Sequence, residues 1–311
     1  MSAGPEPLDL HHQGVDRVIG SYLVETRDGP AIFDCGPASA LPALKEQLRA
    51  SGMELGQIAY LLLSHIHLDH AGAAGAIVRE HQHVQVHVSE VGAPHLIDPS
   101  RLEASARRLY GDAFDALWGE LVPVPEENIR VVGDDVLGLA CFPTPGHASH
   151  HVCFLDEDGT LYAGDAAGVR IAPSRIVTPP TPPPDVDVDA WDATLDELRR
   201  RAPTRLALVH FGVFDDVERH LEELRERLHA WEELVEAGAT QEEFVARTHA
   251  GLGDLTADDL DAVERAMPAW QSYAGLKRWV ERIKNPSRAG ASSTGRDGRV
   301  RGKDAGSARI D

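Results

Sequence analysis

Four side chains that bind metals well lie within six residues, in the segment Ser64-His-Ile-His-Leu-Asp-His-Ala71. They are His65, His67, Asp69 and His70. In an extended segment the first two imidazoles point to the same side, so both can reach one ion. The other two follow one turn later and can face a second ion. Imidazole and carboxylate without thiolate favour a catalytic metal site over a closed structural one.

Three further side chains of this kind follow apolar segments that the pattern predicts as strands. They are His147, Asp165 and His210, and each lies close to the end of such a segment. A single histidine at a strand end is usually a structural residue. Together with the first cluster, however, these residues put His or Asp at the ends of four strands. Because ligands bind where sheet ends meet, we expect all seven side chains to share one cavity.

The elements that must position these residues predict a layered α/β protein with mixed sheets. Apolar runs bounded by turn signals predict strands at 18–26, 30–34, 60–63, 84–88, 130–132, 138–142, 151–155, 160–163 and 206–209. Apolar residues at helical spacing predict helices at 40–51, 72–81, 100–121, 190–201 and onward from 217. Within 100–121 the expected inward side chains are Leu102, Leu109, Phe114, Leu117 and Leu121.

Local signals mark several turns and helix starts. Asp28-Gly29 predicts a hairpin turn between the first two strands. Thr240 with Glu243 is a capping-box pattern, and Thr256 is an expected N-cap. The proline-rich segment 173–184 cannot form a helix or a central strand, so we expect a stiff surface loop. This segment and 100–121 either wall a substrate pocket or are plain surface crossovers.

Composition restricts the classes of partner. The chain has 311 residues, a formal net charge of −20 and three cysteines. The acidic balance argues against nucleic acid or an anionic membrane as the main partner. No apolar run approaches the ~20 residues that span a bilayer, and no signal-peptide pattern is visible. We therefore expect a cytoplasmic protein with reduced thiols and a small-molecule substrate. The apolar stripe on 217–231 fits either the core or the face of a homo-oligomer.

The seven residues resemble the signature of the metallo-β-lactamase-fold superfamily, HxHxDH followed by a distant His, Asp and His. The resemblance covers about residues 15–215. It implies an α/β fold, an αβ/βα four-layer sandwich with C-terminal helices. It further implies two ligand sets and a bridge: one ion at His65, His67 and His147, a second at Asp69, His70 and His210, and Asp165 between them.

The same resemblance bears on residues around the ligands. Asp34, in Ile-Phe-Asp-Cys-Gly, resembles a buried aspartate that supports the metal loop of this family. His151 either contacts a ligand from behind or simply begins the next strand. Asp69 is expected to orient the nucleophile as well as to bind metal. The sequence leaves the roles of His11, His12 and His150 open.

The resemblance also implies an organisation and an activity. We expect a metallo-β-lactamase-like domain at 1–214, a helical segment at 215–284 and a disordered tail at 285–311. The expected activity is hydrolysis of a small ester-like substrate, a thioester or a lactone, by a metal-bound hydroxide. Two zinc ions are expected, with iron or manganese as alternatives.

Two other functions remain open. One is a mononuclear iron persulfide dioxygenase, which some members of the superfamily are, although the complete second ligand set argues against it. The other is a non-catalytic metal-binding protein of the same fold. The acidic chain argues against a nuclease. The acidic residues after His210 also argue against a glutathione thioesterase, whose helical domain is basic.

Overall fold

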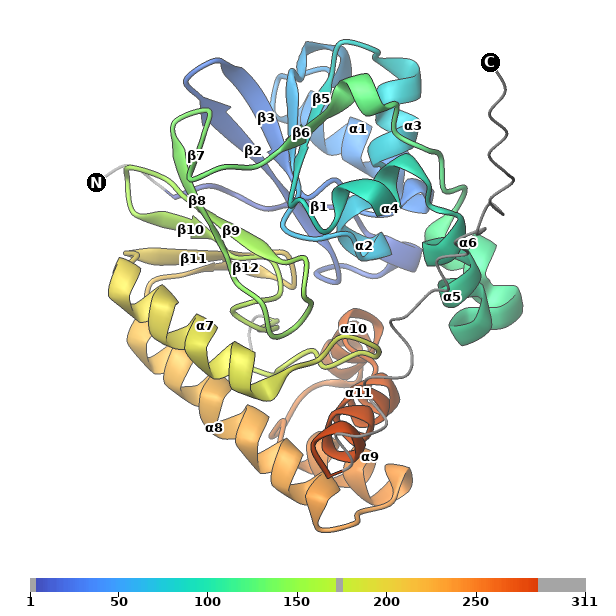
Figure 1. Ribbon diagram of the computed structural model, residues 1–311, viewed down its shortest axis with the longest axis vertical. Helices are drawn as coiled ribbons and strands as arrows, with labels where there is room; N and C mark the ends of the chain where they lie inside the picture. Colours follow the sequence, from blue (N-terminus) through green and yellow to red (C-terminus); the bar gives the residue numbers. More distant parts are fainter. Residues whose placement is uncertain (1–3, 172–175, 285–311) are drawn as a thin grey trace, which may run out of the picture.

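The structure is a computed structural model that describes residues 4–171 and 176–284 (Figure 1). Over these residues the strands form two six-stranded sheets, in the orders β1-β2-β3-β4-β5-β6 and β12-β11-β10-β9-β8-β7. The first sheet comprises β1 (Leu8–Asp9), β2 (Gly20–Thr26), β3 (Gly29–Phe33), β4 (Tyr60–Leu62), β5 (Gln85–Val88) and β6 (Ile129–Val131). The second comprises β7 (Asp135–Val136), β8 (Leu139–Pro143), β9 (Val152–Leu155), β10 (Thr160–Tyr162), β11 (Arg205–Leu208) and β12 (Gly212–Phe214).

Both sheets are mixed. In the first, β2 and β3 form the expected antiparallel hairpin, whereas β3, β4, β5 and β6 run parallel. In the second, only β10 and β11 are parallel neighbours among the described strands. Aromatic rings join the two inner faces: Phe33 lies 6.0 Å from Phe154 and 5.4 Å from Tyr162, centroid to centroid. The predicted α/β sandwich is confirmed.

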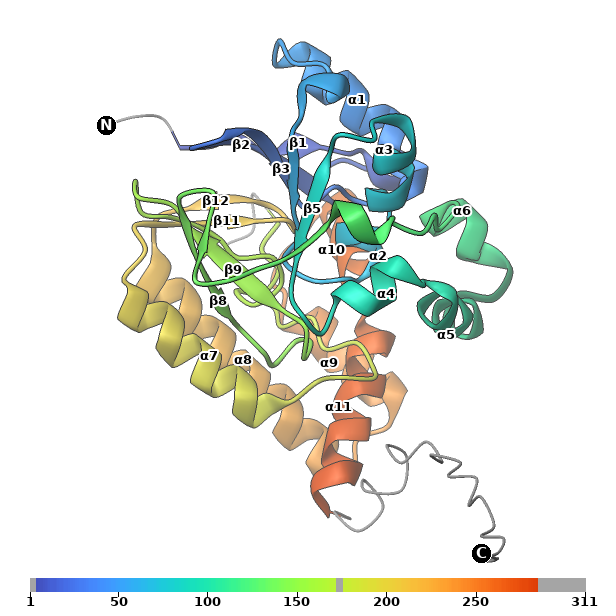
Figure 2. The same ribbon diagram turned by 45° about the horizontal axis from the view of Figure 1, so that its top comes forward.

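Helices lie around the two sheets, and only some of them cover an outer face (Figure 1). The helices are α1 (Leu41–Ala50), α2 (Leu68–Ala71), α3 (Ala74–Glu80), α4 (Ala93–Ile97), α5 (Ser100–Tyr110), α6 (Phe114–Trp118), α7 (Val188–Arg201), α8 (Val217–Glu236), α9 (Gln241–Ala250), α10 (Ala257–Ala266) and α11 (Ala269–Lys284). Short 3₁₀ turns are η1 (His12–Gly14), η2 (Ala38–Ala40), η3 (Leu55–Gln57), η4 (Gly111–Ala113) and η5 (Glu126–Asn128). Figure 2 shows α1 and α3 outside the first sheet and α7 and α8 outside the second.

Helix α8 packs on the second sheet's side of the core through the apolar stripe predicted over 217–231. Val217, Leu221, Leu224, Leu228 and Trp231 are all buried, and they belong to the same hydrophobic core as the strands. This stripe therefore lies in the core. The capping box of α9 and the threonine N-cap of α10 are also confirmed. The domain boundary expected at residue 214 stays a prediction.

The helix expected over 100–121 is broken. It divides into α5 and α6 at Gly111, whose φ of +54° lies in a region that residues with a side chain rarely adopt. The expectation for Leu109 is wrong, since its side chain is 36% exposed. Phe114 and Trp118 do point inward, and they pack with Leu68 in a small apolar cluster of their own.

The expected surface loop at 173–184 is wrong where the structure describes it, from residue 176. Val177, Thr178 and Thr181 are buried. Helix α8 holds the first part of the segment, where the Val177 N–H donates to Glu223 Oε1 at 3.1 Å. Helix α11 packs on Thr181, whose Oγ1 donates a hydrogen bond of 3.1 Å to the carbonyl of Ser272. Gly275 permits this approach, because a Cβ there would overlap the carbonyl oxygen of Thr181. The prolines of this segment exclude helix and central strand, but they do not indicate which helix packs against it.

Three strands were missed, namely β1, β7 and β12. Each has two or three residues, too few to show an alternating pattern. The last of them follows His210, where no strand was expected. The predicted tail at 285–311 lies outside the described residues. Among the helices of the described residues, none has the length and apolar character required to cross a bilayer.

Candidate metal centre

The seven predicted side chains come from four chain segments that meet at one end of the two sheets. His65 and His67 follow β4, and Asp69 and His70 lie on the short helix α2 that comes next. The other three come from the second sheet: His147 from the loop between β8 and β9, Asp165 from the end of β10 and His210 from the end of β11. The structure brings all seven together.

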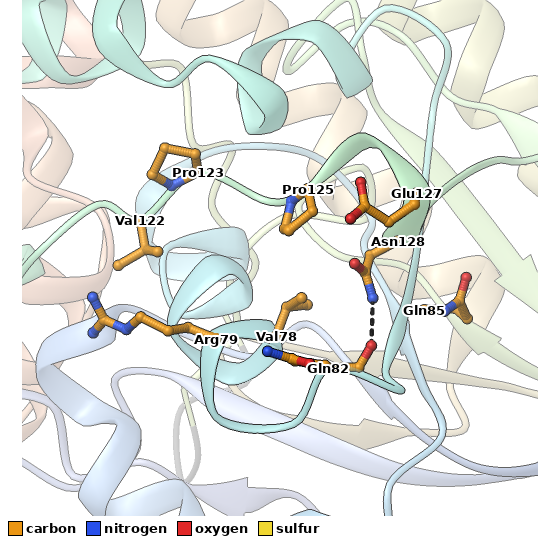
Figure 3. A pocket seen from close by; sticks show the side chains of 9 residues that line it. All are labelled: Val78, Arg79, Gln82, Gln85, Val122, Pro123, Pro125, Glu127 and Asn128. Carbon is orange, nitrogen blue, oxygen red and sulfur yellow. Dashed lines mark hydrogen bonds between the residues drawn. The ribbon is translucent and has the colours of Figure 1, made fainter.

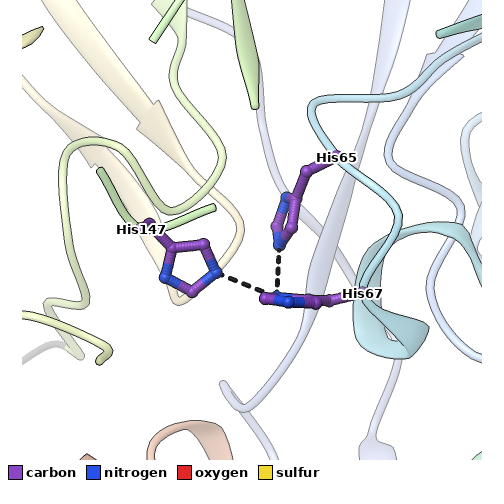
Figure 4. A group of neighbouring side chains, drawn as sticks. All are labelled: His65, His67 and His147. Carbon is purple, nitrogen blue, oxygen red and sulfur yellow. Dashed lines mark hydrogen bonds between the residues drawn. The ribbon is translucent and has the colours of Figure 1, made fainter. Parts of the chain in front are cut away.

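Three imidazoles form the first group of neighbouring ligand atoms (Figure 4). His67 Nδ1 lies 3.0 Å from His65 Nε2 and 2.9 Å from His147 Nε2. One imidazole nitrogen has a single in-plane proton or lone pair, so it cannot pair with both neighbours at once. Three nitrogens bound ~2.0–2.1 Å from a tetrahedral zinc ion lie about 3.3 Å apart, close to this spacing. The group therefore fits a cation better than a set of hydrogen bonds.

The protonation state of these three imidazoles also suits metal binding. Burial, followed by the charge of the neighbouring imidazoles, lowers the pKa of His67 to about 3. The same two causes lower the pKa of His65 well below its ordinary value. Burial also lowers the pKa of His147. All three side chains are thus neutral near pH 7, the form of histidine that binds metal.

The second group consists of Asp69, His70 and His210. Asp69 Oδ2 lies 3.4 Å from His210 Nε2 and 3.8 Å from His70 Nε2. Burial alone would lower the pKa of His70, but the carboxylates of Asp165, Asp69 and Asp34 raise it well above its ordinary value. This half of the site is therefore negative enough to attract a positive charge.

Asp165 faces both groups. Its Oδ2 lies 3.4 Å from His147 Nε2, in the first group. Its Oδ1 lies 3.4 Å from His70 Nε2 and 3.7 Å from His210 Nε2, in the second. One carboxylate thus presents a separate oxygen to each set of imidazoles.

Three buried ligand atoms have no hydrogen-bond partner within the described ranges: His70 Nε2, His210 Nε2 and Asp165 Oδ1. Buried polar atoms are almost always paired. All three belong to the second group or face it. A divalent cation would satisfy all of them together, and the oxygen and nitrogen donor set suits zinc, iron or manganese.

In four of the candidate ligand histidines, the Nδ1 atom, which faces away from the centre, is hydrogen-bonded to an oxygen. His147 Nδ1 lies 2.8 Å from the Pro180 carbonyl and His210 Nδ1 lies 2.6 Å from the Val18 carbonyl. A carbonyl only accepts, so Nδ1 carries the proton and Nε2 offers its lone pair to the centre. His70 Nδ1 likewise meets Asp34 Oδ2 at 2.8 Å, and His65 Nδ1 meets Ser64 Oγ at 2.9 Å.

Asp34, expected to support the metal loop, is fully buried beneath it. Besides its contact with His70, it accepts hydrogen bonds from the backbone and the hydroxyl of Ser64, at 2.8 and 2.6 Å. It therefore joins β3 to the segment that carries four of the predicted ligands. The hydroxyl proton of Ser64 is used here, so its oxygen accepts from His65.

His151 contacts a ligand from behind and also precedes a strand. Its Nε2 accepts a hydrogen bond of 3.1 Å from the backbone N–H of Asp165, and its Nδ1 lies 2.7 Å from Thr144 Oγ1. Strand β9 begins at the next residue. His150, whose role was open, stacks on His65 at 5.9 Å between ring centroids.

Several supporting groups had no signal in the sequence. The carbonyls of Pro180 and Val18 belong to the backbone, which carries no residue-specific mark. Trp191 lies with its ring 5.8 Å from that of His147 and donates a hydrogen bond of 2.8 Å to the Ala166 carbonyl. It thereby connects two ligand segments, but its position in an amphipathic helix predicts only core packing.

A separate pocket of about 510 Å³ opens on the outside of the first sheet, and none of the seven side chains lines it. Figure 3 shows its lining, with Val78, Arg79 and Gln82 on one side and Pro123, Pro125 and Glu127 on the other, and the Asn128 amide donating to the Gln82 carbonyl at 2.9 Å.

Comparisons with known proteins agree with this geometry. A family model described as the metallo-beta-lactamase superfamily matches residues 16–212. The metallo-beta-lactamase fold-containing protein ST1585 of Sulfurisphaera tokodaii is 27% identical over 181 residues, 55% of this chain and 67% of that protein. The N-acyl homoserine lactonase AiiA of Bacillus thuringiensis subsp. kurstaki is 27% identical over 162 residues, 44% of this chain and 57% of the lactonase. The alignments thus leave a third or more of each relative unmatched.

Solved structures match over more of the chain. The crystal structure of ST1585 superposes with a TM-score of 0.65 at 19% identity, covering 88% of this chain and 97% of the other. The metallo-beta-lactamase family protein TTHA1429 of Thermus thermophilus gives 0.63 at 21% identity, covering 91% and 93%. At these identities the match shows the fold, and its extent means that the shared architecture reaches into the C-terminal helices.

Proposed function

The chain belongs to the metallo-β-lactamase superfamily, and from that premise we propose that it is a hydrolase with two divalent ions, zinc by preference, that cleaves a small thioester or lactone. The observation that carries the proposal is Asp165, whose two oxygens face two separate groups of ligand atoms. Relatives named N-acyl homoserine lactonase, 26% and 27% identical, support a lactone as the substrate.

The residues that would hold the ions are those of the two groups. His65, His67 and His147 would hold one, and Asp69, His70 and His210 the other, with Asp165 between them. Ions held there would supply Lewis acidity, which polarises a carbonyl oxygen and acidifies water.

The exposed side of the centre defines where a substrate approaches. His65, His70, His147, Asp165 and His210 are buried, whereas His67 and Asp69 are partly exposed. The Asp69 side chain is 21% exposed. A substrate therefore reaches the centre past these two residues.

Asp69 also has the properties of a group that orients an attacking water. Burial would raise its pKa, but the charge of His70 and the hydrogen bond and charge of His210 hold it well below the ordinary range. An ionised Asp69 accepts a hydrogen bond from water and so directs its lone pair at the substrate carbon. This is the catalytic role that we propose for it, besides that of ligand.

The test begins with elemental analysis of protein purified without added metal. About two zinc ions per chain, with hydrolysis in a screen of thioesters and lactones, is the expected result. One iron per chain, with oxygen consumption on a persulfide, would instead identify a dioxygenase. Bound metal without turnover of any of these substrates would leave only the non-catalytic metal-binding function.

A matched pair of variants completes the test. Asp165→Asn should lose both metal and hydrolysis, because the amide nitrogen cannot serve as a ligand oxygen toward the second ion. Asp158→Asn, in a turn remote from the centre, serves as the control and should retain both. Equal activity in the two variants would remove Asp165 from the site.

A further inference from the structure

His150 lies beside the metal centre without being one of the seven predicted ligands. Its ring is perpendicular to that of His67, at 89° and 5.5 Å between centroids. It is nearly parallel to that of His65, at 12° and 5.9 Å. His67 is one of the two partly exposed residues past which a substrate reaches the centre. An imidazole outside the ligand set therefore borders the path of the substrate.

One ring nitrogen of His150 is already used. The backbone N–H of Ile66, between His65 and His67, donates to His150 Nδ1 at 3.5 Å. A ring nitrogen that accepts carries a lone pair, so the proton of this neutral ring is on Nε2. The contact thus selects the tautomer in which Nε2 is a donor.

This Nε2–H donor is free and accessible. Nε2 of His150 makes no hydrogen bond within residues 4–171 and 176–284. The unpartnered Nε2 atoms of His70 and His210 are enclosed by the protein, but that of His150 is not. A fixed N–H group that is accessible beside a metal centre can meet an oxygen of a bound substrate.

Hydrogen bonds on two sides hold the loop that carries His150. Its carbonyl accepts a hydrogen bond of 2.7 Å from the hydroxyl of Ser89, the residue after β5. The hydroxyl of Ser149 donates to Asp185 Oδ2 at 2.9 Å. The loop is thus tied both to the first sheet and to the segment before α7. A donor held in this way loses little freedom when a substrate binds.

We propose that His150 is a catalytic residue whose Nε2–H donates a hydrogen bond to the carbonyl oxygen of the substrate. The inference rests on the hydrolase function proposed above and deepens it. Addition of hydroxide to the carbonyl carbon moves the π electron pair onto that oxygen, where a fixed donor stabilises the charge. The pair returns as the bond to the leaving oxygen or sulfur breaks. The leaving atom keeps the bonding pair and takes the proton of the added hydroxyl, so the products are a carboxylate and an alcohol or thiol.

Two substitutions separate the two nitrogens of this ring. His150→Asn puts an amide oxygen where Nδ1 accepts from Ile66, but it leaves no group at the position of Nε2. It should lower kcat about a hundredfold, with metal content and KM near their wild-type values. His150→Gln gives up the Nδ1 acceptor and brings its amide nitrogen near the position of Nε2. It should keep kcat within about tenfold of the wild type.

His229→Asn is the matched control, because it also replaces an imidazole by an amide. His229 is 41% exposed on α8, with Nε2 2.8 Å from Asp192 Oδ2, and its replacement should leave kcat unchanged. Circular dichroism shows whether each variant is folded. Wild-type kcat in His150→Asn would overturn the proposal. Loss of metal from His150→Gln in the same experiment would show that the ring only positions Ile66.

A change in the substrate shows whether the hydrogen bond is made to the carbonyl oxygen. Sulfur is a weaker acceptor than oxygen. His150→Asn should therefore reduce kcat less on a thionolactone, which has sulfur in place of the carbonyl oxygen, than on the matching lactone. A purely structural role would reduce kcat on both by the same factor, and that result would overturn the proposal.

NMR of protein with isotope-labelled histidine identifies the tautomer without turnover. We expect His150 to carry its proton on Nε2, with a resonance that is missing from His150→Asn. A proton on Nδ1 would overturn the inference and leave the hydrolase function standing. If the wild type hydrolyses neither lactones nor thioesters, the hydrolase function is wrong, and the inference is wrong with it.

Discussion

Single residues form the candidate metal centre, and their types and spacing were enough to predict that these side chains meet. All seven side chains meet because HxHxDH places four ligands on one segment, and the other three stand at strand ends. The sequence could not show what orients them. His147 and His210 are held by the carbonyls of Pro180 and Val18, and every residue has a carbonyl.

Substitution of Asp34 tests whether hydrogen bonds from behind the candidate ligands orient them for metal binding. The two oxygens of Asp34 accept three hydrogen bonds, from Ser64 N, Ser64 Oγ and His70 Nδ1. Asp34→Asn keeps the shape but leaves one accepting oxygen, so at least one of these contacts is lost. Metal affinity should fall about ten- to a hundredfold, measured by competition with a chelator. Unchanged affinity would show that His70 is oriented by other contacts.

A buried histidine outside the centre contributes to the loss of stability in acid. His220 is fully buried, and it lies 2.7 Å from the Ala167 carbonyl through Nε2 and 3.3 Å from an Arg170 nitrogen through Nδ1. Burial lowers its pKa to about 4. The unfolded chain, with a pKa near 6.5, binds the proton first, so stability falls as the pH drops from about 7 toward 4.

This shift predicts a measurable slope. Between pH 7 and pH 5 the free energy of unfolding should fall by about 2 kcal/mol on account of His220 alone. His220→Gln, whose amide can still donate to Ala167, should remove this contribution. His229→Gln, on the exposed side of the same helix, should not. The check is urea unfolding of metal-free protein at both pH values. An equal fall in the free energy of unfolding in the wild type and both variants would show that His220 does not cause this pH dependence.

Elements were predictable where their patterns are long. The β2–β3 hairpin, α1, α7 and α8 all form near their expected residues. The short strands β1, β7 and β12 were missed. A glycine in the middle of 100–121 divides a helix that its apolar spacing made continuous. The buried proline-rich segment depends on α11, about ninety residues later in the chain, so local sequence contains no sign of it.

The contact between α11 and this segment carries a prediction at the same scale. A Cβ on Gly275 would overlap the carbonyl oxygen of Thr181. The preceding residue is Pro180, whose carbonyl accepts the hydrogen bond from His147 Nδ1. Gly275→Ala should cost about 1–3 kcal/mol of stability and weaken metal binding at His147. A cobalt-substituted sample reports this directly, through its d–d absorption spectrum. Gly251→Ala, with 3.4 Å to its nearest neighbour, is the control. Identical cobalt spectra for Gly275→Ala and Gly251→Ala would show that α11 does not influence metal binding at His147.

At the scale of the whole molecule, the C-terminal helices are part of the core. Leu276 and Trp279 of α11 belong to the same hydrophobic core as the strands. Arg17, near the N-terminus, pairs with Asp259 of α10 at 2.9 Å. The family model ends at residue 212, yet these helices pack against the segments that support the site. Sequence periodicity predicted that they are helices, but periodicity does not give long-range packing partners.

Two truncations separate these parts of the chain. A chain that ends at Lys284, the last residue of α11, should keep its metal and its activity, because all seven ligands and their described supports remain. A chain that ends at Phe214 exposes the apolar surface under α8 and should be insoluble. Metal content and activity of the soluble fraction provide the measurement. Loss of metal from the longer chain would contradict this view.

The arrangement of two ions across one carboxylate is tested most directly by crystallography of zinc-loaded protein at the zinc absorption edge. We predict two anomalous peaks, one beside His65, His67 and His147 and one beside Asp69, His70 and His210, each within bonding distance of a different Asp165 oxygen. A single peak in fully loaded crystals, or two peaks that do not share Asp165, would contradict the account.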